Sequence, residues 1–328
     1  MRPVFCFGEL LIDFLSISEH QSDGLTLKDY RQYPGGAPAN AAVAVAKLGG
    51  KSYFAGQVGS GIFGDFLKQA LERYGVDTRF LLQHPTAKTA LAFVERAPDG
   101  DRRFSFYRHE TADLLMTPEQ VDNAWFADPV IFHFCSNTLT TDAITTCTHY
   151  AVDQALSQNN LISFDVNLRH NLWPDGHADK DRVNSLVYKS HVVKFSRDEL
   201  EYLASGDLES YIREALKTTC QLILVTDGGN IMSYHTASHS GEILPPPVDP
   251  VDTTAGGDAF IGGFLHAISR TNDPFAALVD RSKLPELLMF ALCCGACTVT
   301  KAGAFPALPD LNEANSLFTR SFPDASST

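Results

Sequence analysis

Short runs of consecutive apolar residues recur along the chain and alternate with segments of helical character. The first run, residues 4–13, ends in the carboxylate of Asp13, and similar runs lie at 52–58, 130–135, 161–165, 191–195 and 221–225. Strands without polar alternation are buried on both faces, as they are in a parallel sheet. The pattern predicts an α/β fold with a mostly parallel sheet. The length of 328 residues allows one large domain with an appendage, or two domains.

Composition excludes several classes of protein. The chain is 44% hydrophobic and 20% charged, as globular proteins are, which argues against disorder. Its formal net charge of −13 argues against a surface for nucleic acid or an anionic membrane, while a local nucleotide site stays open. We find no signal peptide at the N-terminus and no apolar run long enough to cross a membrane.

Seven cysteines lie at irregular spacing, an odd number that argues against a disulfide framework. Cys294 and Cys297 form a Cys-x-x-Cys pair in an apolar segment, but no second Cys or His pair follows at zinc spacing. We interpret them as buried helical thiols. A reducing, cytoplasmic location fits this cysteine usage.

Residues 250–264 combine two adjacent glycines with the start of a helix. Gly256 and Gly257 allow backbone N–H groups to approach a ligand closely, and free N–H groups at a helix start attract anions. Asp258, in the first turn, is placed to accept a proton from an attacking hydroxyl. This combination suits phosphoryl transfer. An Asp258 that only complements the helix dipole is the alternative.

A second pair of glycines, Gly35 and Gly36, precedes an Ala- and Val-rich helix that contains Asn40. The glycines permit close backbone approach to a polar ligand, and an amide offers both a donor and an acceptor to a sugar hydroxyl. Small residues that only let the helix pack closely on the sheet are the alternative explanation. A third glycine segment, Gly59–Gly64, has the G-x-G-x-x-G spacing of dinucleotide-binding enzymes. Against that class, Asp77 falls at the start of the next strand.

The chain resembles the PfkB (ribokinase-like) carbohydrate kinases over nearly its whole length. Residues 252–258 read Asp-Thr-Thr-Ala-Gly-Gly-Asp where that family has Asp-Thr-Thr-Gly-Ala-Gly-Asp, and residues 35–40 match its Gly-Gly-x-x-x-Asn element. Residues 8–13, Gly-Glu-x-Leu-x-Asp, resemble the fructokinase-type branch. The resemblance implies a ribokinase-like three-layer fold with a mostly parallel central sheet and a small discontinuous β-sheet lid from about 14–34 and 87–112.

The resemblance also implies roles for individual residues. Asp258 becomes the catalytic base, and the N–H groups of Ala255, Gly256, Gly257 and Asp258 become an anion hole. The residues expected to bind the sugar are Asp13, Gly35, Gly36, Asn40, Arg108 and Arg169. For Arg108, a solvated hairpin end is the alternative.

The nucleotide and its ions have their own expected residues. Those for the nucleotide are Asn167, Lys194, Ser196, Thr226, Gly228 and Gly229, with an ordinary hairpin turn as the alternative at 226–229. Glu199 is expected in the outer sphere of Mg²⁺, although Ser196 and Glu199 also form a capping box. The K⁺ residues are Asp252, Thr254, Lys301 and Gly303, and Asp252 could equally cap its loop.

We therefore expect ATP-dependent phosphorylation of a sugar's primary hydroxyl, most simply fructose to fructose 6-phosphate, with Mg²⁺ and K⁺ as ions. Kinases of 2-keto-3-deoxygluconate or ribose share this chemistry. Two hypotheses of a different class compete with it: a dinucleotide oxidoreductase that uses Gly59–Gly64, and a sugar-binding protein without catalytic activity. The apolar face of the lid suits a homodimer.

Overall fold

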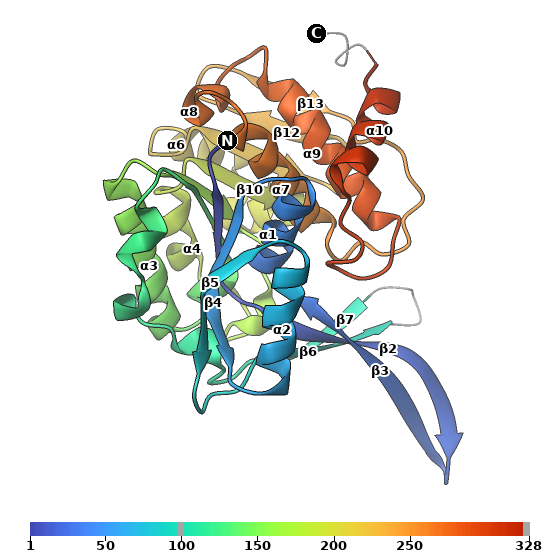
Figure 1. Ribbon diagram of the computed structural model, residues 1–328. Coiled ribbons are helices and arrows are strands. Elements are labelled where there is room, and N and C mark those ends of the chain that lie inside the picture. The colour runs from blue at the N-terminus through green and yellow to red at the C-terminus, as the bar shows by residue number, and fades with distance from the viewer. Residues whose placement is uncertain (97–101, 324–328) are drawn as a thin grey trace.

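A large twisted sheet forms the centre of the molecule in the computed structural model, which describes residues 1–96 and 102–323 (Figure 1). The strand order is β13-β12-β11-β10-β9-β8-β1-β4-β5. All neighbouring strands from β11 to β5 run parallel, while β12 and β13 are antiparallel at one edge. The strands are β1 Val4–Phe7, β4 Ser52–Gly59, β5 Asp77–His84, β8 Ile131–Cys135, β9 Leu161–Asp165, β10 Val192–Ser196, β11 Leu222–Thr226, β12 Met232–His235 and β13 Ser240–Ile243.

Helices cover both faces of this sheet. One face carries α1 Ala37–Lys47, α2 Ile62–Arg73, α7 Gly256–Ser269 and α9 Leu284–Val299, with α10 Leu311–Ser321 packed on α9. The other face carries α3 Asp142–Ser157, α4 Lys180–Val187, α5 Arg197–Ala204 and α6 Leu208–Ala215. The remaining short elements are α8 Pro274–Ala277 and the 3₁₀ turns η1 Ala112–Leu115, η2 Pro118–Gln120, η3 Asn123–Phe126, η4 Ser136–Leu139 and η5 His170–Leu172.

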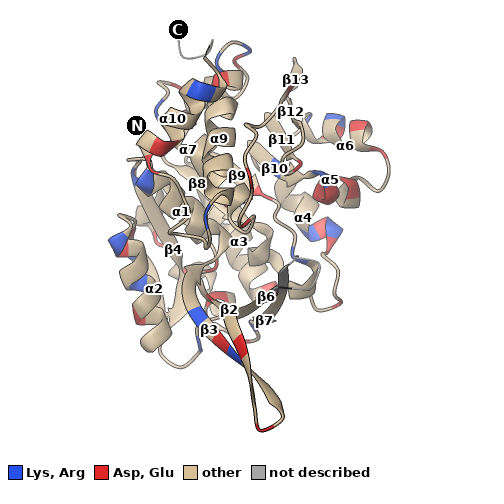
Figure 2. Cartoon of the chain, turned by 90° about the vertical axis from the view of Figure 1, so that its right-hand side faces the viewer, with Lys and Arg blue, Asp and Glu red and all other residues tan. Residues whose placement is uncertain are grey.

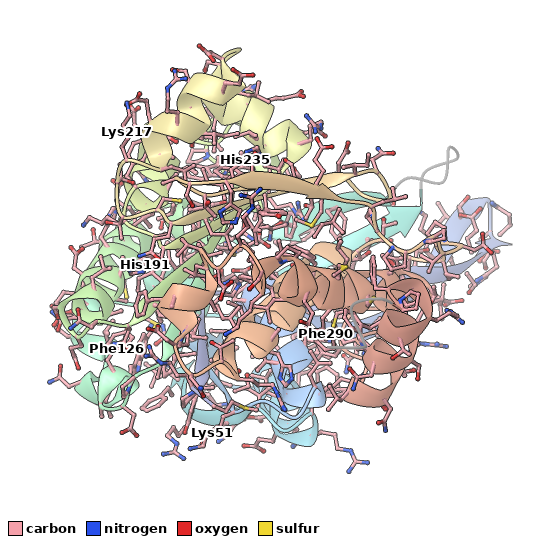
Figure 3. All side chains as sticks on the ribbon, turned by 90° about the horizontal axis from the view of Figure 1, so that it is seen from above. Lys51, Phe126, His191, Lys217, His235 and Phe290 are labelled. Atoms are coloured by element: carbon pink, nitrogen blue, oxygen red, sulfur yellow. The ribbon has the colours of Figure 1, made fainter. Side chains whose placement is uncertain are left out.

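Two separate cores follow from the alternation of side chains along each strand. On β1, Val4 and Cys6 join the core under α1 and α7, whereas Phe5 and Phe7 join the core under α3 and α4. Fully burying one phenylalanine contributes about 1.5–3 kcal/mol, so both cores stabilise the sheet. Viewed from above, Phe126 and Phe290 lie on opposite sides of the central sheet (Figure 3). The predicted three-layer fold is confirmed.

A second sheet forms the lid, in the order β3-β2-β6-β7. Its strands are β2 Leu11–Ser22, β3 Leu25–Gly35, β6 Leu91–Arg96 and β7 Arg102–Tyr107, so the small sheet is discontinuous in sequence, as predicted. The hairpin of β2 and β3 extends away from the body of the molecule (Figure 1). The sequence Pro-Asp-Gly at residues 98–100 predicts a turn between β6 and β7, and this turn lies outside the described residues.

The prediction of one strand over residues 4–13 is wrong. The chain leaves the large sheet after Phe7 and enters the lid sheet at Leu11. At the break, Gly8 has φ +147°, and a Cβ there would lie 2.7 Å from Cγ of Pro38. Few residues other than glycine fit so close an approach at positive φ. Asp13 is therefore a lid residue and does not belong to the central sheet.

Acidic and basic residues lie close together on helices such as α2 and α6 (Figure 2). Within residues 1–96 and 102–323, no helix combines the length and apolarity needed to cross a membrane.

Candidate active site

The start of α7 provides backbone donors and a carboxylate at one point. Ala255 is the N-cap residue, and α7 begins at Gly256. The N–H of Gly256 donates a long hydrogen bond of 3.3 Å to the carbonyl of Thr253. The N–H groups of Gly257 and Asp258 belong to the first turn, where no intrahelical acceptor exists. Both N–H groups belong to the predicted anion hole, whose contact with phosphate stays a prediction.

Asp258 is buried and hydrogen-bonded to α1. Nδ2 of Asn40 donates to Oδ2 of Asp258 at 2.7 Å, although 218 positions separate the two residues. Burial raises the pKa of Asp258 to about 7, and the negative Asp165 adds to the shift, while Asn40, Arg169 and Lys194 oppose it. Oδ1 of Asn40 is also buried, and among the described residues it has no hydrogen-bond partner. A sugar hydroxyl could donate to that atom.

Lys194 brings a cation to the same helix start. Its Nζ lies 3.0 Å from Oδ1 of Asp165, and a Cβ on Gly257 would lie 3.2 Å from the same nitrogen. Burial alone would lower the pKa of Lys194, but the charges of Asp165 and Glu199 outweigh it and raise the pKa. Lys194 is thus a permanent cation beside the free N–H groups.

Lid and body meet next to these residues. A Cβ on Gly36 would overlap the carbonyl of Glu9, and Gly36 has φ +112°, so position 36 requires glycine; a Cβ on Gly35 would displace the carboxylate of Asp13. A small cavity of about 20 Å³ between the sheets is bounded by Asp13, Leu15, Tyr33, Val94, Thr254, Gly303 and Ala304. Of the predicted sugar residues, Asp13 lines this cavity and Gly35 lies against the Asp13 carboxylate.

The two predicted arginines lie in different surroundings. Arg169 is close enough to lower the pKa of Asp258. Nε of Arg108 donates to Oδ2 of Asp113 at 2.6 Å, and its Nη2 donates to the carbonyl of Asn137 at 2.9 Å. The Arg108 side chain is only 3% exposed, so the alternative of a solvated hairpin end is wrong. Its contact with substrate stays a prediction.

A cavity of about 350 Å³ opens on the other side of the α7 start. It is enclosed by the turn at 226–229, the proline run at 245–247, α7 and α9. The lining residues are Thr226, Asp227, Gly228, Gly229, Met232, Pro245, Pro246, Pro247, Val248, Pro250, Thr253, Gly256, Gly257, Phe260, Leu292, Gly295, Ala296 and Val299. Its size and largely apolar walls suit the base and ribose of a nucleotide. Sequence reasoning missed the proline run, although three consecutive prolines are a visible signal of rigid extended chain.

Glu199 makes three structural contacts. The capping box with Ser196 is present: Oε2 of Glu199 accepts from the N–H of Ser196 at 2.7 Å, and Oγ of Ser196 accepts from the N–H of Glu199 at 3.3 Å. Oε1 of Glu199 accepts from the N–H of Leu168 at 2.7 Å. It thereby fixes the loop after β9, where Asn167 has a left-handed φ of +38°. A metal role for Glu199 stays a prediction.

The proposed potassium residues partly converge. Oδ1 of Asp252 accepts from the N–H of Thr254 at 3.0 Å, and Oδ2 accepts from the N–H of Gly303 at 2.8 Å. Asp252 therefore caps its own loop and also joins it to the chain after α9. Nζ of Lys301 instead pairs with Oε1 of Glu313 at 2.5 Å on the surface, so only its backbone could face such a site.

Contacts within the fold account for three further features of the chain. Gly64 packs against the carbonyl of Gly59, where a Cβ would overlap it, so the third glycine segment serves close packing. Nδ1 of His133 lies 3.1 Å from Oγ of Ser163, and burial lowers the pKa of His133 to about 3. Cys294 is a free, fully buried thiol in α9, as predicted, whereas Cys297 of the same helix is only partly buried, so the prediction of a buried thiol is wrong for Cys297.

Comparison with known proteins gives one consistent result. Residues 1–311 match the pfkB family carbohydrate kinases. The probable fructokinase-7 of Arabidopsis thaliana is 37% identical over 324 residues, covering 96% of this chain and 92% of the relative. The fructokinase of Xylella fastidiosa, solved with bound ATP, has 41% identity and a TM-score of 0.90, with 97% and 98% of the two chains covered. A double mutant of the Vibrio cholerae fructokinase, solved with fructose, ADP and potassium, has 29% identity and a TM-score of 0.85, covering 97% and 98%.

Proposed function

This chain belongs to the pfkB family of carbohydrate kinases, and we propose that it transfers the γ-phosphoryl group of ATP to the primary hydroxyl of fructose, giving fructose 6-phosphate. One observation carries the proposal. Asp258, hydrogen-bonded to Asn40 of α1, directly follows Gly256 and Gly257, which line a nucleotide-sized cavity at the start of α7.

Proton transfer falls to Asp258. A pKa of about 7 means that the carboxylate is available at neutral pH and is still basic enough to take the hydroxyl proton. The hydrogen bond from Asn40 orients the carboxylate and keeps its pKa from rising further. The proton leaves the primary hydroxyl as its oxygen attacks the γ-phosphorus, and ADP is the leaving group.

Charge stabilisation falls to the helix start. The N–H groups of Gly257 and Asp258 and the ammonium of Lys194 lie beside one another and act on the phosphoryl oxygens as negative charge spreads over them. These groups are fixed by the fold before the nucleotide arrives, so little reorganisation is needed during the reaction.

Asp13, Gly35, Gly36 and Asn40 hold the sugar, with Arg169 at the phosphate side. Asp13 comes from the lid and Asn40 from the body, so a bound sugar would join the two parts. Closing the lid over the sugar excludes water, which would otherwise accept the phosphoryl group.

Two ions fit the residues present. The described residues contain no cluster of three or more His, Cys, Asp or Glu side chains that could hold a metal, so a Mg²⁺ would be held mainly by nucleotide phosphates and water, with Glu199 in its outer sphere. Bound Mg²⁺ neutralises phosphate charge. The oxygen-rich loop around Asp252 suits K⁺, and the Vibrio cholerae structure was solved with potassium. To test the K⁺ site, the rate is measured in KCl and in choline chloride. A higher rate in KCl would support the site, and equal rates would contradict it.

A coupled assay of ADP release over a panel of sugars tests the substrate. We expect fructose to give the highest kcat/KM, above ribose and 2-keto-3-deoxygluconate. A higher kcat/KM for either of those sugars would contradict the assignment to fructose. An enzyme that binds fructose but releases no ADP would contradict kinase activity altogether.

The lid also supports a proposal on assembly. Ile17, Leu25 and Leu27 on the β2–β3 hairpin are 49%, 64% and 43% exposed. Exposed apolar residues on a projecting sheet suit a contact with a second copy of the chain, so we propose a homodimer through the lid.

The free thiols of the described cysteines are in keeping with a cytoplasmic enzyme.

A further inference from the structure

Glu9 is a buried carboxylate to which the proposed mechanism gives no role. It follows β1, where the chain passes from the large sheet to the lid, and it is only 2% exposed. Its Oε1 accepts from the N–H of Ala37 at 3.2 Å and from Nδ2 of Asn137 at 2.9 Å. Its Oε2 lies 3.6 Å from Sγ of Cys135. These contacts hold the carboxylate in a single place.

The contact with Ala37 connects Glu9 to the catalytic base. Ala37 is the first residue of α1, and the N–H of Asn40 donates to the carbonyl of Gly36 at 2.8 Å in the same turn. A negative charge at a helix N-terminus is favourable. Since a Cβ on Gly36 would overlap the carbonyl of Glu9, the backbone of Glu9 also fixes this turn. Glu9 therefore determines where Asn40 lies.

The contact with Asn137 connects Glu9 to the lid. Arg108 directly follows β7, and its Nη2 donates to the carbonyl of Asn137 at 2.9 Å. Nε of Arg108 is bound to Asp113. Asn137 thus contacts the end of a lid strand with its carbonyl and Glu9 with its amide.

We propose that Glu9 is a positioning residue for phosphoryl transfer, because its carboxylate fixes the first turn of α1 where Asn40 meets Asp258 and, through Asn137, joins that turn to the lid. The inference rests on the proposed kinase function and adds a residue to it. Without an acceptor at position 9, the N–H of Ala37 loses its partner and the turn gains freedom. The hydrogen bond from Asn40 to Asp258 then weakens.

The pH profile gives a readout that a merely structural role would not move. The charged groups facing Asp258 are Asp165, Arg169 and Lys194, and the buried thiol of Cys135, which also contacts Glu9, lies near it; all four remain when residue 9 is changed. The hydrogen bond from Asn40 lowers the pKa of Asp258, so weakening it raises that pKa. The acid limb of kcat/KM for fructose then moves to higher pH.

Three substitutions of Glu9 separate the effect of side-chain length from the effect of charge. Glu9→Ala and Glu9→Asp should lower kcat/KM for fructose by about tenfold or more, move the acid limb up by about half a pH unit, and leave KM for ATP unchanged. Glu9→Asp keeps the charge but is one methylene shorter, and it carries the test if Glu9→Ala does not fold. Glu9→Gln retains an oxygen acceptor and should keep the wild-type limb.

Asn160→Ala is the matched control. Asn160 is fully buried and lies at the opposite end of the strands from the site. Its Oδ1 accepts a hydrogen bond from the N–H of Val130 at 2.7 Å, and its Nδ2 donates to the carbonyl of Ala155 at 3.2 Å. We expect it to lower Tm without moving the limb. An unmoved limb in Glu9→Asp, or an equal shift in Asn160→Ala, would overturn the inference. A wild type without sugar kinase activity would instead contradict the proposed function.

Discussion

At the scale of a single residue, the surroundings of Asp258 decide its pKa. Its sequence position predicts a carboxylate at a helix start, where exposed acids ordinarily remain ionised. In the fold it is 8% exposed and near Asp165, and these two effects raise its pKa to about 7. The same residue therefore becomes a base that titrates near neutral pH.

Replacing Asp258, the proposed base, should strongly lower kcat. Asp258→Asn keeps the size of the side chain and an acceptor for Asn40 but cannot take a proton, so kcat should fall by about 10²–10⁴-fold. The Kd for fructose, measured by calorimetry, should stay close to that of the wild type because the sugar contacts are retained. A variant that keeps more than about a tenth of the wild-type kcat would show that another group is the base.

The pH dependence follows from the same residue. Because burial raises the pKa of Asp258 to about 7, kcat/KM for fructose should fall as the pH drops below about 7, where the carboxyl is protonated and cannot accept the hydroxyl proton. Asn40→Ala removes a hydrogen bond that lowers this pKa, so its acid limb should lie at higher pH. A pH profile that stays flat down to about pH 5 would contradict this assignment.

At the scale of elements, α7 lies between the places proposed for the two substrates. Its first turn carries Gly257 and Asp258, the large cavity lies on the side of α9, and the lid lies on the side of α1. Changes in the α9 wall should therefore affect the nucleotide alone.

A bulky side chain on the α9 wall of the cavity should weaken the binding of ATP and leave the binding of fructose unchanged. Ala296 lines the cavity of about 350 Å³ and has little exposed surface. Ala296→Phe places a ring in the space proposed for the base, so KM for ATP should rise about tenfold or more, while KM for fructose stays constant. Glu286→Phe, on an exposed position of the same helix, is the control. If both variants bind ATP as the wild type does, the nucleotide lies elsewhere.

At the scale of the whole molecule, the outer part of the projecting β2–β3 hairpin lies outside the two large cores, although Ile12 at its base belongs to one of them. Both large cores are built mainly from the central sheet and its helices. The exposed apolar residues of the hairpin, by contrast, are left without cover in a single chain. Their effect should be seen in assembly and not in folding.

The double substitution Ile17→Lys with Leu25→Lys tests the proposed homodimer. Light scattering should give the mass of a dimer for the wild type and about half that mass for the variant, because charges at an apolar contact are costly to bury. Tyr150→Lys, an exposed aromatic on α3, is the control and should leave the mass unchanged. A wild type with the mass of one chain would rule out the dimer.

The sequence determined the α/β class, the β-rich runs of the lid, the helix after Gly35 and Gly36, and the glycine–carboxylate start of α7. These features are local, since apolar runs, glycine pairs and caps act over a few neighbouring residues. The tertiary structure decided the break at Gly8, the pairing of Asn40 with Asp258, the burial of Arg108 against Asp113 and the contacts of Glu9. Such features depend on burial and on contacts between residues far apart in the chain. Local patterns cannot specify them, because desolvation and long-range hydrogen bonds exist only once the layers have packed.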